Sequence, residues 1–536
     1  MKEFYDKFSK ILEELVEKEF SISLGQPLWE LPKDKRFGDL SSMAALKLAS
    51  QLKKDPLEIA TLIKAALEKS LSGYVEKIEI LKPGFINVFI SRSILKKSLA
   101  KILDQKSSFF GQNIKRKTLI EFLSANPTGP LSIAHGRQAV VGDVIANILE
   151  FCGNKVTKEY YINDAGRQID LLVESVESLL GSEREEKIPE DGYKGEYIRD
   201  IANLILNNKK YKINPKKFGL RKFILKHILD DLIKKDLNSL GISFDNWISQ
   251  EKIIASKKVQ KAIEILNKKG LIYEKEDASW FKATKFGDDK DRVIKKADSE
   301  LTYFASDIAY HKDKINRKHD KLINLWGPDH HGYIKRLEAA IRALGYKKEV
   351  LEVIIIQLVT LKTKERMSKR SGKFIPLADL IADIGKDATR FYYLTRKNSS
   401  HLEFDIDLAK KTSFDNPLYY IQYVCARITS IFKKAKSKSF EAKFNKFLVQ
   451  DEEIDLLRAL LQFSYCLEKA YYSLEPVFII EFLKDLASSF HKFYEKVRVI
   501  DKDKNITRAR LNLLFAVQTV FCSGLKLLGI KPAKKM

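Results

Sequence analysis

A short apolar run, a loop rich in proline and glycine, and a second apolar run follow one another without a break near residue 120. Leu119–Leu123 is mostly apolar, Ser124–Arg137 forms the loop, and apolar residues return with helical spacing from Ala139 to Phe151. This order predicts a strand, a loop and a helix start with His135 in its first turn. Because a helix N-terminus offers unpaired N–H groups and a positive dipole end, it suits phosphate. The segment therefore predicts a nucleotide site at the carboxyl end of a parallel sheet.

The pattern of the remaining sequence divides the chain into three parts. Residues 1–105 combine helical and strand patterns, as a small α/β module would. Residues 106–405 alternate short apolar runs with helical patterns, which is typical of a doubly wound fold. The clearest strands there are Leu119–Leu123, Leu322–Trp326 and Val353–Val359, and residues 171–299 read as a basic, mainly helical insertion within the sheet. Residues 406–536 show only helical periodicity.

Composition places the chain among globular proteins. It has 536 residues, 45% hydrophobic and 31% charged, and no run of eighteen apolar residues, so a membrane span is not expected. The N-terminus is amphipathic and lacks the apolar core of a signal peptide. Its expected buried face holds Phe4, Phe8, Ile11, Leu12 and Leu15.

The cysteine content and the net charge limit which metals and which macromolecular partners are expected. The four cysteines lie far apart in the sequence and form no Cys-x-x-Cys pair, so we expect buried thiols in a reducing cytoplasm and no thiolate zinc site. The formal net charge of +25 suits a polyanionic partner such as nucleic acid. A general lysine bias explains the same charge equally well, so charge alone does not establish the partner.

Arg366–Gly372 is a second chemistry-bearing segment. It places serine, glycine and three cations in seven residues, just after a predicted strand. Such a loop can wrap a polyphosphate, and Lys369 is its best-placed charge for a phosphoryl group in transfer. Taken in isolation, a basic surface turn explains the segment better.

Two further segments carry polar groups beside apolar runs. In Trp326–Tyr333, Asp329 follows a predicted strand and could bind a ribose hydroxyl, while the neighbouring histidines could instead hold a metal or belong to a structural turn. In Leu301–His311, Tyr303 and Asp307 share one helical face. An acid on an apolar surface requires a cation, unless Ser306 or Asp307 simply caps a helix.

The order of these four segments resembles that of class I aminoacyl-tRNA synthetases, with Ser124–Arg137 similar to the HIGH motif and Arg366–Arg370 similar to the KMSKS loop. The sequence segments around them resemble the arginyl-tRNA synthetase family. These segments are Glu159–Gly166, Gly192–Ile198, Phe286–Val293, Tyr303–His311, Asp329–Tyr333, Asn416–Tyr423 and Pro83–Asn87. The resemblance spans nearly the whole chain.

The resemblance implies a multidomain α/β fold. A small N-terminal α/β domain that binds tRNA would occupy residues 1–105, and a Rossmann-like catalytic domain residues 106–405. An all-α anticodon-binding domain would occupy residues 406–536. It also implies a cytoplasmic monomer that joins L-arginine to tRNA(Arg) through arginyl-adenylate. ATP with Mg²⁺ would be the second substrate, and the first step would require bound tRNA.

The resemblance also implies residue roles. His135, Lys369 and Ser132 would be catalytic, and Asn87 would contact the tRNA elbow. The ATP site would comprise Ala125, Asn126, Pro127, Thr128, Gly129, Pro130, Leu131, Ser132, Ile133, Ala134, His135, Gly327, Asp329, Met367, Ser368 and Lys369. The arginine site would comprise Glu121, Ser124, Asn126, His135, Tyr303, Asp307 and His330. Tyr419, Tyr420 and Tyr423 would either stack on anticodon bases or belong to a helical core.

Physical chemistry agrees with an arginine site. A planar guanidinium with five donors requires carboxylate or carbonyl acceptors in a fixed arrangement. Unsatisfied buried carboxylates would reject neutral citrulline by a factor of roughly 10⁴ or more, so an editing domain is not needed.

The motifs depart from the family pattern at several positions. Ser132 stands for the first histidine of HIGH and Ala134 for its glycine, while Arg366 and Arg370 stand in the second motif for a lysine and a serine. Loss of one transition-state donor costs about 3 kcal/mol, although the Ser132 hydroxyl can still donate. These departures leave a tRNA-binding relative that does not charge tRNA as the main alternative. A class I enzyme for another amino acid is a third candidate.

Overall fold

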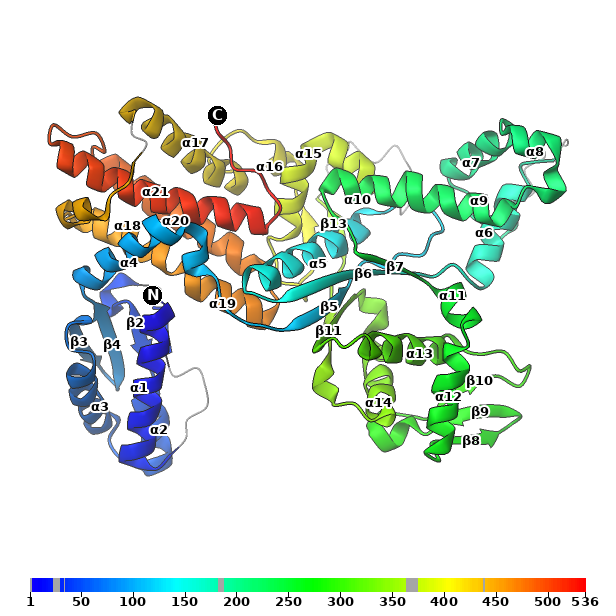
Figure 1. Ribbon diagram of the computed structural model, residues 1–536, viewed down its shortest axis with the longest axis horizontal. Helices are drawn as coiled ribbons and strands as arrows, with labels where there is room; N and C mark the ends of the chain where they lie inside the picture. The colour runs from blue at the N-terminus through cyan, green and yellow to red at the C-terminus, as the bar shows by residue number, and fades with distance from the viewer. Residues whose placement is uncertain (1, 23–28, 33, 182–187, 363–374, 437–438) are drawn as a thin grey trace.

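The computed structural model describes residues 2–22, 29–32, 34–181, 188–362, 375–436 and 439–536. A central parallel sheet joins three other parts of the molecule (Figure 1). The N-terminal domain lies below the C-terminal helices at one end, and the helices inserted after β6 project at the other end. The expected multidomain α/β fold with an all-α C-terminal domain is confirmed.

The N-terminal domain packs helices on one small antiparallel sheet of order β1-β2-β4-β3. Its elements are α1 (Lys2–Phe20), β1 (Trp29–Glu30), β2 (Leu40–Ser42), α2 (Ala44–Leu52), α3 (Pro56–Ser70), β3 (Val75–Leu81) and β4 (Phe85–Ile90). The apolar face expected on α1 is buried at Phe4, Phe8, Leu12 and Leu15 and half-buried at Ile11. The helix thus forms because its apolar stripe faces the sheet.

The helix that follows this sheet, α4 (Arg92–Gln105), packs against C-terminal helices α18 (Asp451–Leu461) and α21 (Lys504–Leu527). Arg92 donates from Nη2 to Asp451 Oδ1 at 2.6 Å. The Lys96 Nζ donates to the Lys446 carbonyl at 3.3 Å. The two ends of the chain are therefore joined through α4.

The central sheet has five parallel strands in the order β12-β11-β5-β6-β7. These strands are β5 (Lys117–Glu121), β6 (Lys155–Ile162), β7 (Asn246–Ser249), β11 (Lys321–Trp326) and β12 (Leu351–Ile355). Helices α5 (Ile133–Phe151), α13 (Tyr303–Asn316), α14 (Ile334–Leu344) and α15 (Leu377–Tyr393) accompany them. From β5 the chain builds the sheet first to one side, through β6 and β7, and later to the other side, through β11 and β12. This change of order beside β5 makes a crevice at the carboxyl ends of the strands, where ligands bind in such folds.

One predicted strand is wrong in part. Val353–Val359 is divided, because β12 ends at Ile355 and a separate strand, β13 (Val359–Leu361), pairs in parallel with β14 (Leu402–Phe404). Gln357 leaves the central sheet, since its N–H donates to the Asn398 carbonyl at 3.0 Å. Its own carbonyl accepts from the buried Arg137 guanidinium at 2.9 Å. An apolar sequence cannot show this break, because the partners are distant in the chain.

The expected insertion at 171–299 is also corrected. Its helices are α6 (Arg167–Glu177), α7 (Glu196–Leu206), α8 (Lys209–Ile213), α9 (Leu220–His227) and α10 (Lys234–Leu240). The chain then returns to the central sheet as β7, so this stretch is not one insertion. A second excursion holds α11 (Gln250–Ala255), α12 (Lys258–Lys268), β8 (Ile272–Lys275), β9 (Ala278–Phe281) and β10 (Arg292–Lys295). The β7 strand has four residues with polar ends, too few to give a periodic signal.

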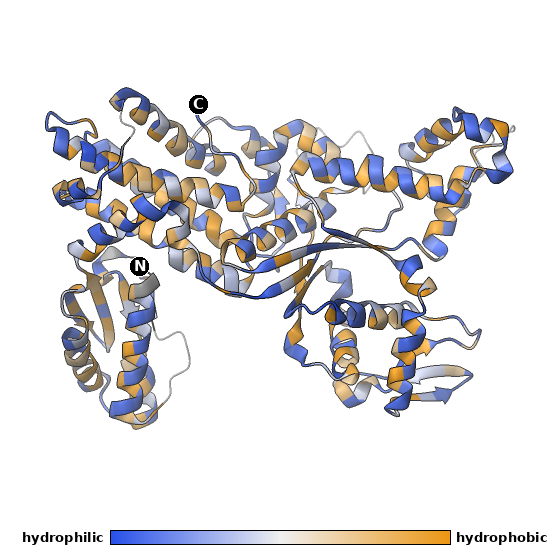
Figure 2. Cartoon of the chain, in the orientation of Figure 1, coloured by the Kyte–Doolittle hydropathy of each residue, from blue (hydrophilic) through white to orange (hydrophobic). Residues whose placement is uncertain are grey.

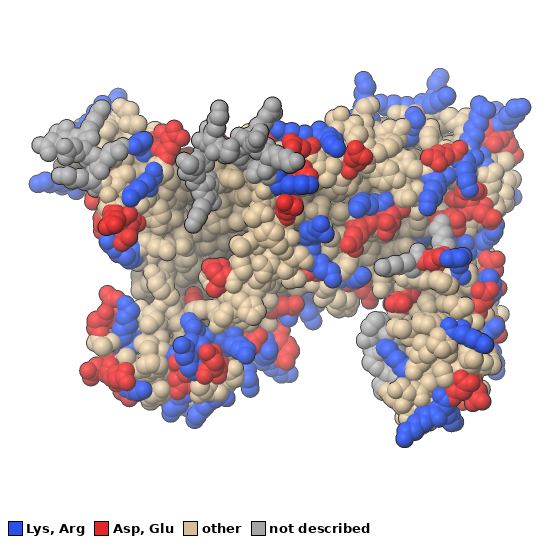
Figure 3. Space-filling view, turned by 180° about the vertical axis from the view of Figure 1, so that it is seen from behind, with Lys and Arg blue, Asp and Glu red and all other residues tan. Residues whose placement is uncertain are grey.

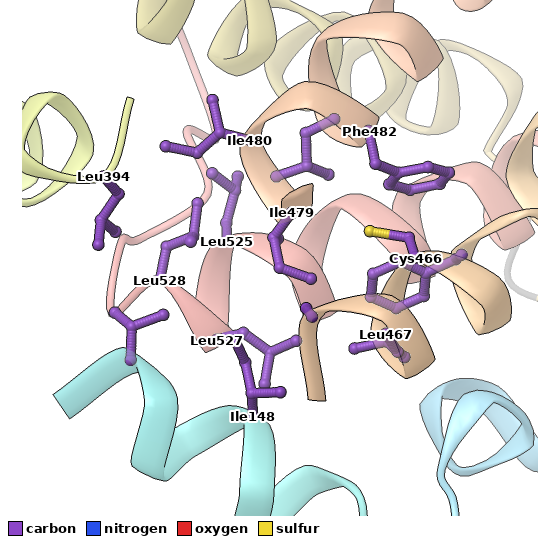
Figure 4. Close-up of a cluster of buried hydrophobic side chains, with 14 of the residues drawn as sticks. Ile148, Leu394, Cys466, Leu467, Ile479, Ile480, Phe482, Leu525, Leu527 and Leu528 are labelled. Carbon is purple, nitrogen blue, oxygen red and sulfur yellow. The ribbon is translucent and has the colours of Figure 1, made fainter. Parts of the chain in front are cut away.

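The C-terminal domain is helical, as its periodicity predicts. Its helices are α16 (Ile406–Lys410), α17 (Pro417–Ala435), α18, α19 (Phe463–Ser473), α20 (Val477–Lys496) and α21. Figure 2 shows hydrophobic and hydrophilic residues alternating around them. Leu456, Leu457, Leu460 and Leu461 are buried on one side of α18. In Figure 4, Ile148 of α5 meets leucines of α19 and α21, so this core continues into the catalytic domain.

The surface agrees with a dispersed positive charge. Figure 3 shows lysine and arginine on every lobe visible from that side, interspersed with acidic residues. Among the described residues, no helix has the length and apolarity to cross a membrane. Cys152, Cys425 and Cys466 are buried free thiols, and Cys522 is half-buried.

A buried ion pair joins several of these elements. Arg390 of α15 donates from Nη2 to Asp143 Oδ2 of α5 at 2.6 Å. The same guanidinium donates to the Leu528 carbonyl after α21 at 2.7 Å and to the Leu240 carbonyl of α10 at 3.1 Å. Lys158 of β6 pairs with the other Asp143 oxygen at 2.8 Å. This hub fixes α5 against the insertion and the C-terminal domain.

Replacement of Arg390 by methionine should therefore destabilise the protein strongly. Removal of one partner of a buried pair leaves uncompensated charge and carbonyls, and costs about 3–5 kcal/mol. The midpoint of urea unfolding, followed by circular dichroism, measures the loss. The matched control is Arg167→Met, because Arg167 pairs with Glu174 on the surface and such pairs contribute about 0–1 kcal/mol. Equal midpoints for the two variants would show that the hub is not a stability determinant.

Candidate active site

The loop after β5 begins with two residues in the left-handed backbone region. Leu123 has φ 71° and Ser124 has φ 38°, and neither is glycine. Such residues are strained and persist where the surroundings hold them, commonly at functional sites. Ser124 Oγ donates to Glu121 Oε1 at 3.0 Å and accepts from the Tyr161 N–H at 3.1 Å. The turn is thus fastened to both neighbouring strands, and it ends β5 at Glu121.

Ser132 caps the helix that follows. Its Oγ accepts from the His135 N–H at 3.4 Å, while its own N–H donates to His135 Nδ1 at 3.1 Å. The two residues form a capping box in which histidine takes the place usually held by glutamate. Because Nδ1 accepts a hydrogen bond, the imidazole is neutral and carries its proton on Nε2. Burial also lowers the pKa of His135 below its ordinary value, so a neutral donor stands at the helix mouth.

A cavity of about 450 Å³ lies beside this helix mouth and contains the expected arginine residues. Every one of them lines it: Glu121, Ser124, Asn126, His135, Tyr303, Asp307 and His330. Five of the residues expected at ATP also line it, namely Ala125, Asn126, His135, Gly327 and Asp329. Segments from distant parts of the sequence therefore meet in one space.

A second cavity of about 360 Å³ shares Ala125, Asn126 and His135 with the first. Thr128, Gly129, Pro130 and Leu131 line it, opposite the segment Tyr193–Tyr197. The Tyr197 hydroxyl donates to the Thr128 carbonyl at 2.7 Å, which holds that segment over the loop.

Other expected ATP residues lie elsewhere. Ser132, Pro127, Ile133 and Ala134 line neither cavity. Ser132 is engaged in the cap, where it orients His135, and its expected catalytic role stays a prediction. Met367, Ser368 and Lys369 lie outside the described residues.

Asp307 is a buried carboxylate of the cavity that forms no ion pair with a lysine or arginine in the part of the chain that the structure describes. Thr302 caps α13, since its Oγ1 accepts from the Ala305 N–H at 3.4 Å, so the capping role considered for Ser306 or Asp307 is wrong. The carboxylate accepts a hydrogen bond from the Tyr333 hydroxyl. Burial raises the pKa of Asp307 to about 6, and the charge of Glu121 adds to this rise. A cationic ligand would restore the charged form.

Glu121, by contrast, is already neutralised within the protein. The buried Lys314 Nζ donates to Glu121 Oε2 and, at 3.0 Å, to Asn324 Oδ1. Asn324 Nδ2 in turn donates to His311 Nε2 at 2.8 Å, and His311 Nδ1 donates to the Asp307 carbonyl at 2.8 Å. This buried chain fixes α13 to β5 and β11. It leaves Asp307 as the carboxylate whose charge faces the cavity.

Tyr303, His330 and Asp329 lie toward the mouth of the cavity. Tyr303 is 61% exposed, and its hydroxyl lies close to Gly166. A Cβ added to Gly166 would lie 2.6 Å from that hydroxyl, and the φ angle of Gly166 is 90°. Only glycine fits there without strain. His330 Nδ1 lies 3.1 Å from Asp329 Oδ2, and its ring lies 5.9 Å from Trp326. Within the described ranges, no three His, Cys, Asp or Glu residues are grouped to hold a metal.

Several residues of the cavity were not identified from the sequence. They are Leu123, Gln138, Tyr161, Asn163, Gln250, Tyr310, His311, Leu325, Trp326 and Tyr333. Tyr161 lies near the end of β6 and Asn163 directly follows that strand. Because the carboxyl end of β6 adjoins that of β5, strand adjacency could have indicated both residues. Asn163 Nδ2 donates to Asn126 Oδ1 at 2.7 Å. Gln250 has no signal in the sequence, because it follows the strand that the pattern missed.

The expected tRNA contact at Asn87 is not available on the surface of this structure. Asn87 lies within β4, opposite Ser41 and Glu79, and is 3% exposed. Its Oδ1 has no hydrogen-bond partner. Asn87 alternates with apolar core residues of β4 and so lies on the opposite face of the sheet. Neighbouring side chains nevertheless cover it.

The tyrosines at the start of α17 are half-buried. Tyr419, Tyr420 and Tyr423 all contact the ring of Phe414, which is 54% exposed. They are therefore neither full core residues nor free surface groups.

Comparison with known proteins adds three family matches. Residues 98–405 match the family model for tRNA synthetases class I (R), catalytic domain. Residues 2–90 match the arginyl tRNA synthetase N terminal domain, and residues 421–536 match the DALR anticodon binding domain.

Curated relatives agree along the length of the chain. The arginine–tRNA ligase of Bacillus pumilus is 42% identical over 529 residues, which cover 95% of this chain and 94% of the relative. The arginine–tRNA ligase of Bacillus subtilis is 41% identical with the same coverage. The Thermus thermophilus arginyl-tRNA synthetase structure shares the fold, with a TM-score of 0.80 over 99% of this chain and 100% of that one, at 19% identity.

The capping box predicts the tautomer of His135. We expect ¹⁵N NMR of labelled histidine to show a protonated Nε2 and an unprotonated Nδ1, with the ring more than half neutral at pH 6.5, because burial lowers its pKa below 6.5. In Ser132→Ala, loss of the cap should cost about 1 kcal/mol of stability. Protonation on Nδ1 in the unaltered protein would contradict the assigned hydrogen bonds.

Proposed function

The chain belongs to the arginyl-tRNA synthetase family and is an arginine–tRNA ligase, and we propose that the cavity beside α5 is where it joins arginine to the α-phosphate of ATP. The single observation behind this assignment is Asp307, a buried carboxylate that has no paired lysine or arginine among the described residues and lies in a cavity that reaches the mouth of α5. The curated relatives are named as arginine–tRNA ligases. Their names support neither of the two alternatives, an enzyme for another amino acid and a tRNA-binding relative that does not charge tRNA.

Asp307 supplies the charge that selects a cationic side chain. Burial makes its ionised form costly until a cation arrives, so the guanidinium of arginine gains a strong ion pair that neutral citrulline cannot make. Glu121 keeps its place through Lys314 and supports this arrangement without adding a second free charge. Tyr303 and His330 close the mouth around the amino-acid end.

ATP lies at the helix mouth in this proposal. The N-terminus of α5 and the Nε2–H of His135 donate to the phosphate, and Gly327 and Asp329 hold the ribose. Mg²⁺ enters with the triphosphate. Lys369 provides the charge that stabilises the pyrophosphate as it leaves.

The reaction then has two displacements. The arginine carboxylate attacks the α-phosphorus, and the bond to pyrophosphate breaks. A ribose hydroxyl at the 3′ end of the tRNA next attacks the arginyl carbonyl, and AMP leaves. Because little covalent chemistry falls to the protein, positioning and charge stabilisation supply the rate.

Binding of tRNA(Arg) belongs to the two outer domains in this proposal. The C-terminal domain, with half-buried Tyr419, Tyr420 and Tyr423, reads the anticodon loop, and the N-terminal domain binds the body of the tRNA. We infer a cytoplasmic monomer as its working form.

The titration of Asp307 gives a pH signature. Arginine binds the ionised carboxylate, whose pKa in the free protein is about 6. Affinity for arginine should therefore be constant above that pH and fall about tenfold for each unit below it. Equilibrium binding of labelled arginine from pH 4.5 to 8, with tRNA present, measures this dependence.

Asp307→Asn should bind weakly at every pH and lose the dependence. The matched control is Asp313→Asn on the same helix, whose carboxylate pairs with Lys258 on the surface and should not alter arginine binding. Constant affinity of the unaltered enzyme between pH 5 and 7 would refute the role of Asp307.

Arginine-dependent ATP–pyrophosphate exchange tests the function itself. We expect exchange with arginine and tRNA present, and no exchange with other amino acids. Lys369→Ala should lower its maximal rate roughly 10²- to 10³-fold, as loss of a transition-state charge does. The KM for arginine should stay unchanged, and the surface variant Lys290→Ala should behave as the unaltered enzyme. An undiminished rate in Lys369→Ala would exclude that lysine from the phosphate chemistry.

A further inference from the structure

Two polar atoms in the wall of the main cavity have no hydrogen-bond partner among the residues that the structure describes. They are the Tyr161 hydroxyl and Gln250 Oε1, and both are buried away from solvent. Tyr161 is 6% exposed and Gln250 is 3% exposed. A buried polar group left unpaired costs about 1–3 kcal/mol, so two in one cavity indicate that a ligand completes them.

The fold holds both side chains at neighbouring strand ends. Tyr161 lies near the end of β6, and Gln250 directly follows β7, with Ile162 opposite Ser249 in the parallel ladder. The Tyr161 ring stacks on Tyr310 with centroids 4.4 Å apart. The start of α11 is fixed because the Glu251 N–H donates to Asp164 Oδ1 at 2.9 Å. The backbone at both positions is therefore fixed by the sheet and by this hydrogen bond.

The carboxylates of the cavity alone do not satisfy a guanidinium. Arginine's side chain has five N–H donors and no acceptor. Each Glu121 oxygen already accepts an internal bond, one from Ser124 and the other from Lys314. One Asp307 oxygen accepts from Tyr333. The donors that Asp307 does not engage therefore need other acceptors in the same space.

We propose that Gln250 Oε1 and the Tyr161 hydroxyl oxygen accept hydrogen bonds from the arginine guanidinium beside Asp307, and that these two residues determine specificity. The charges of Asp307 and Glu121 both act on the Tyr161 hydroxyl, which places it close to the two carboxylates. This inference rests on the proposed arginine site and adds two neutral acceptors to it.

The division of labour follows from the chemistry of the three groups. Asp307 attracts any cation, including the ammonium of lysine. Neutral acceptors at fixed positions add direction, which a planar guanidinium satisfies and a compact ammonium does not. A site built to pair with a ligand's donors rejects a ligand that lacks them, because its own buried groups stay unpaired.

The test compares two buried glutamines. Gln250→Leu removes the amide at similar size, and Gln112→Leu is the matched control, because Gln112 is 5% exposed, has an unpartnered amide nitrogen, and lies outside the cavity. Steady-state ATP–pyrophosphate exchange by the full chain, with tRNA present, gives KM for arginine and for ATP. Inhibition by butylguanidine, which has a guanidinium but no amino-acid end, probes the guanidinium alone. Tyr161→Phe serves as the second variant.

Gln250→Leu should raise the KM for arginine about 10- to 100-fold, the range for a hydrogen bond to a charged group. The inhibition constant of butylguanidine should rise by the same factor, with the KM for ATP unchanged. Tyr161→Phe should act in the same direction, and Gln112→Leu should change neither constant.

Unchanged arginine and butylguanidine constants in both variants would overturn the inference. If Asp307→Asn still abolished binding, the proposed arginine site itself would stand. A loss for arginine without a loss for butylguanidine would also overturn it, since the residues would then contact the amino-acid end. Equal losses for arginine and ATP would overturn it in favour of a structural role.

Discussion

The position of α5 depends on one buried charge pair. Asp143 holds Arg390, and Arg390 reaches carbonyls of α10 and of the segment after α21. Three separate parts of the chain are thereby fixed against the helix whose N-terminus forms the mouth of the cavity. Because the guanidinium is fully buried, each of its bonds forms in a low dielectric, where an unmade bond is costly. Displacement of any partner would shift the N-terminal end of α5.

In the cavity, by contrast, one of two buried carboxylates is paired with a cation and the other is not, among the residues that the structure describes. Glu121 lies near Asp307, and two free carboxylates so close would repel each other. Lys314 removes that conflict by pairing with Glu121, and Asn324 and His311 hold the lysine in turn. One carboxylate is thus structural and the other is left for a ligand. The unpaired hydroxyl of Tyr161 and amide oxygen of Gln250 lie in the same wall.

The departure at Ser132 has a physical consequence that the motif alone does not reveal. A serine is among the best N-cap residues, and here it caps α5 while its backbone N–H fixes the His135 ring. The remaining histidine is thereby held neutral, with Nε2–H free to donate. Ala134 lines neither cavity, so its methyl group does not fill the space left for substrate.

The sequence by itself determined the order of domains, the strand–loop–helix unit at Leu119–Phe151, and the residue types that line the arginine side of the cavity. Local periodicity, helix capping and short motifs encode these features, so they can be read without the fold. Only the tertiary structure decided which of two carboxylates keeps its charge for a ligand, that Asn87 is covered, and that Gln250 joins the site. Those outcomes depend on contacts between different segments of the chain, such as Glu121 with Lys314 at a separation of 193. Burial and pairing at that range are properties of packing, and no local pattern records them.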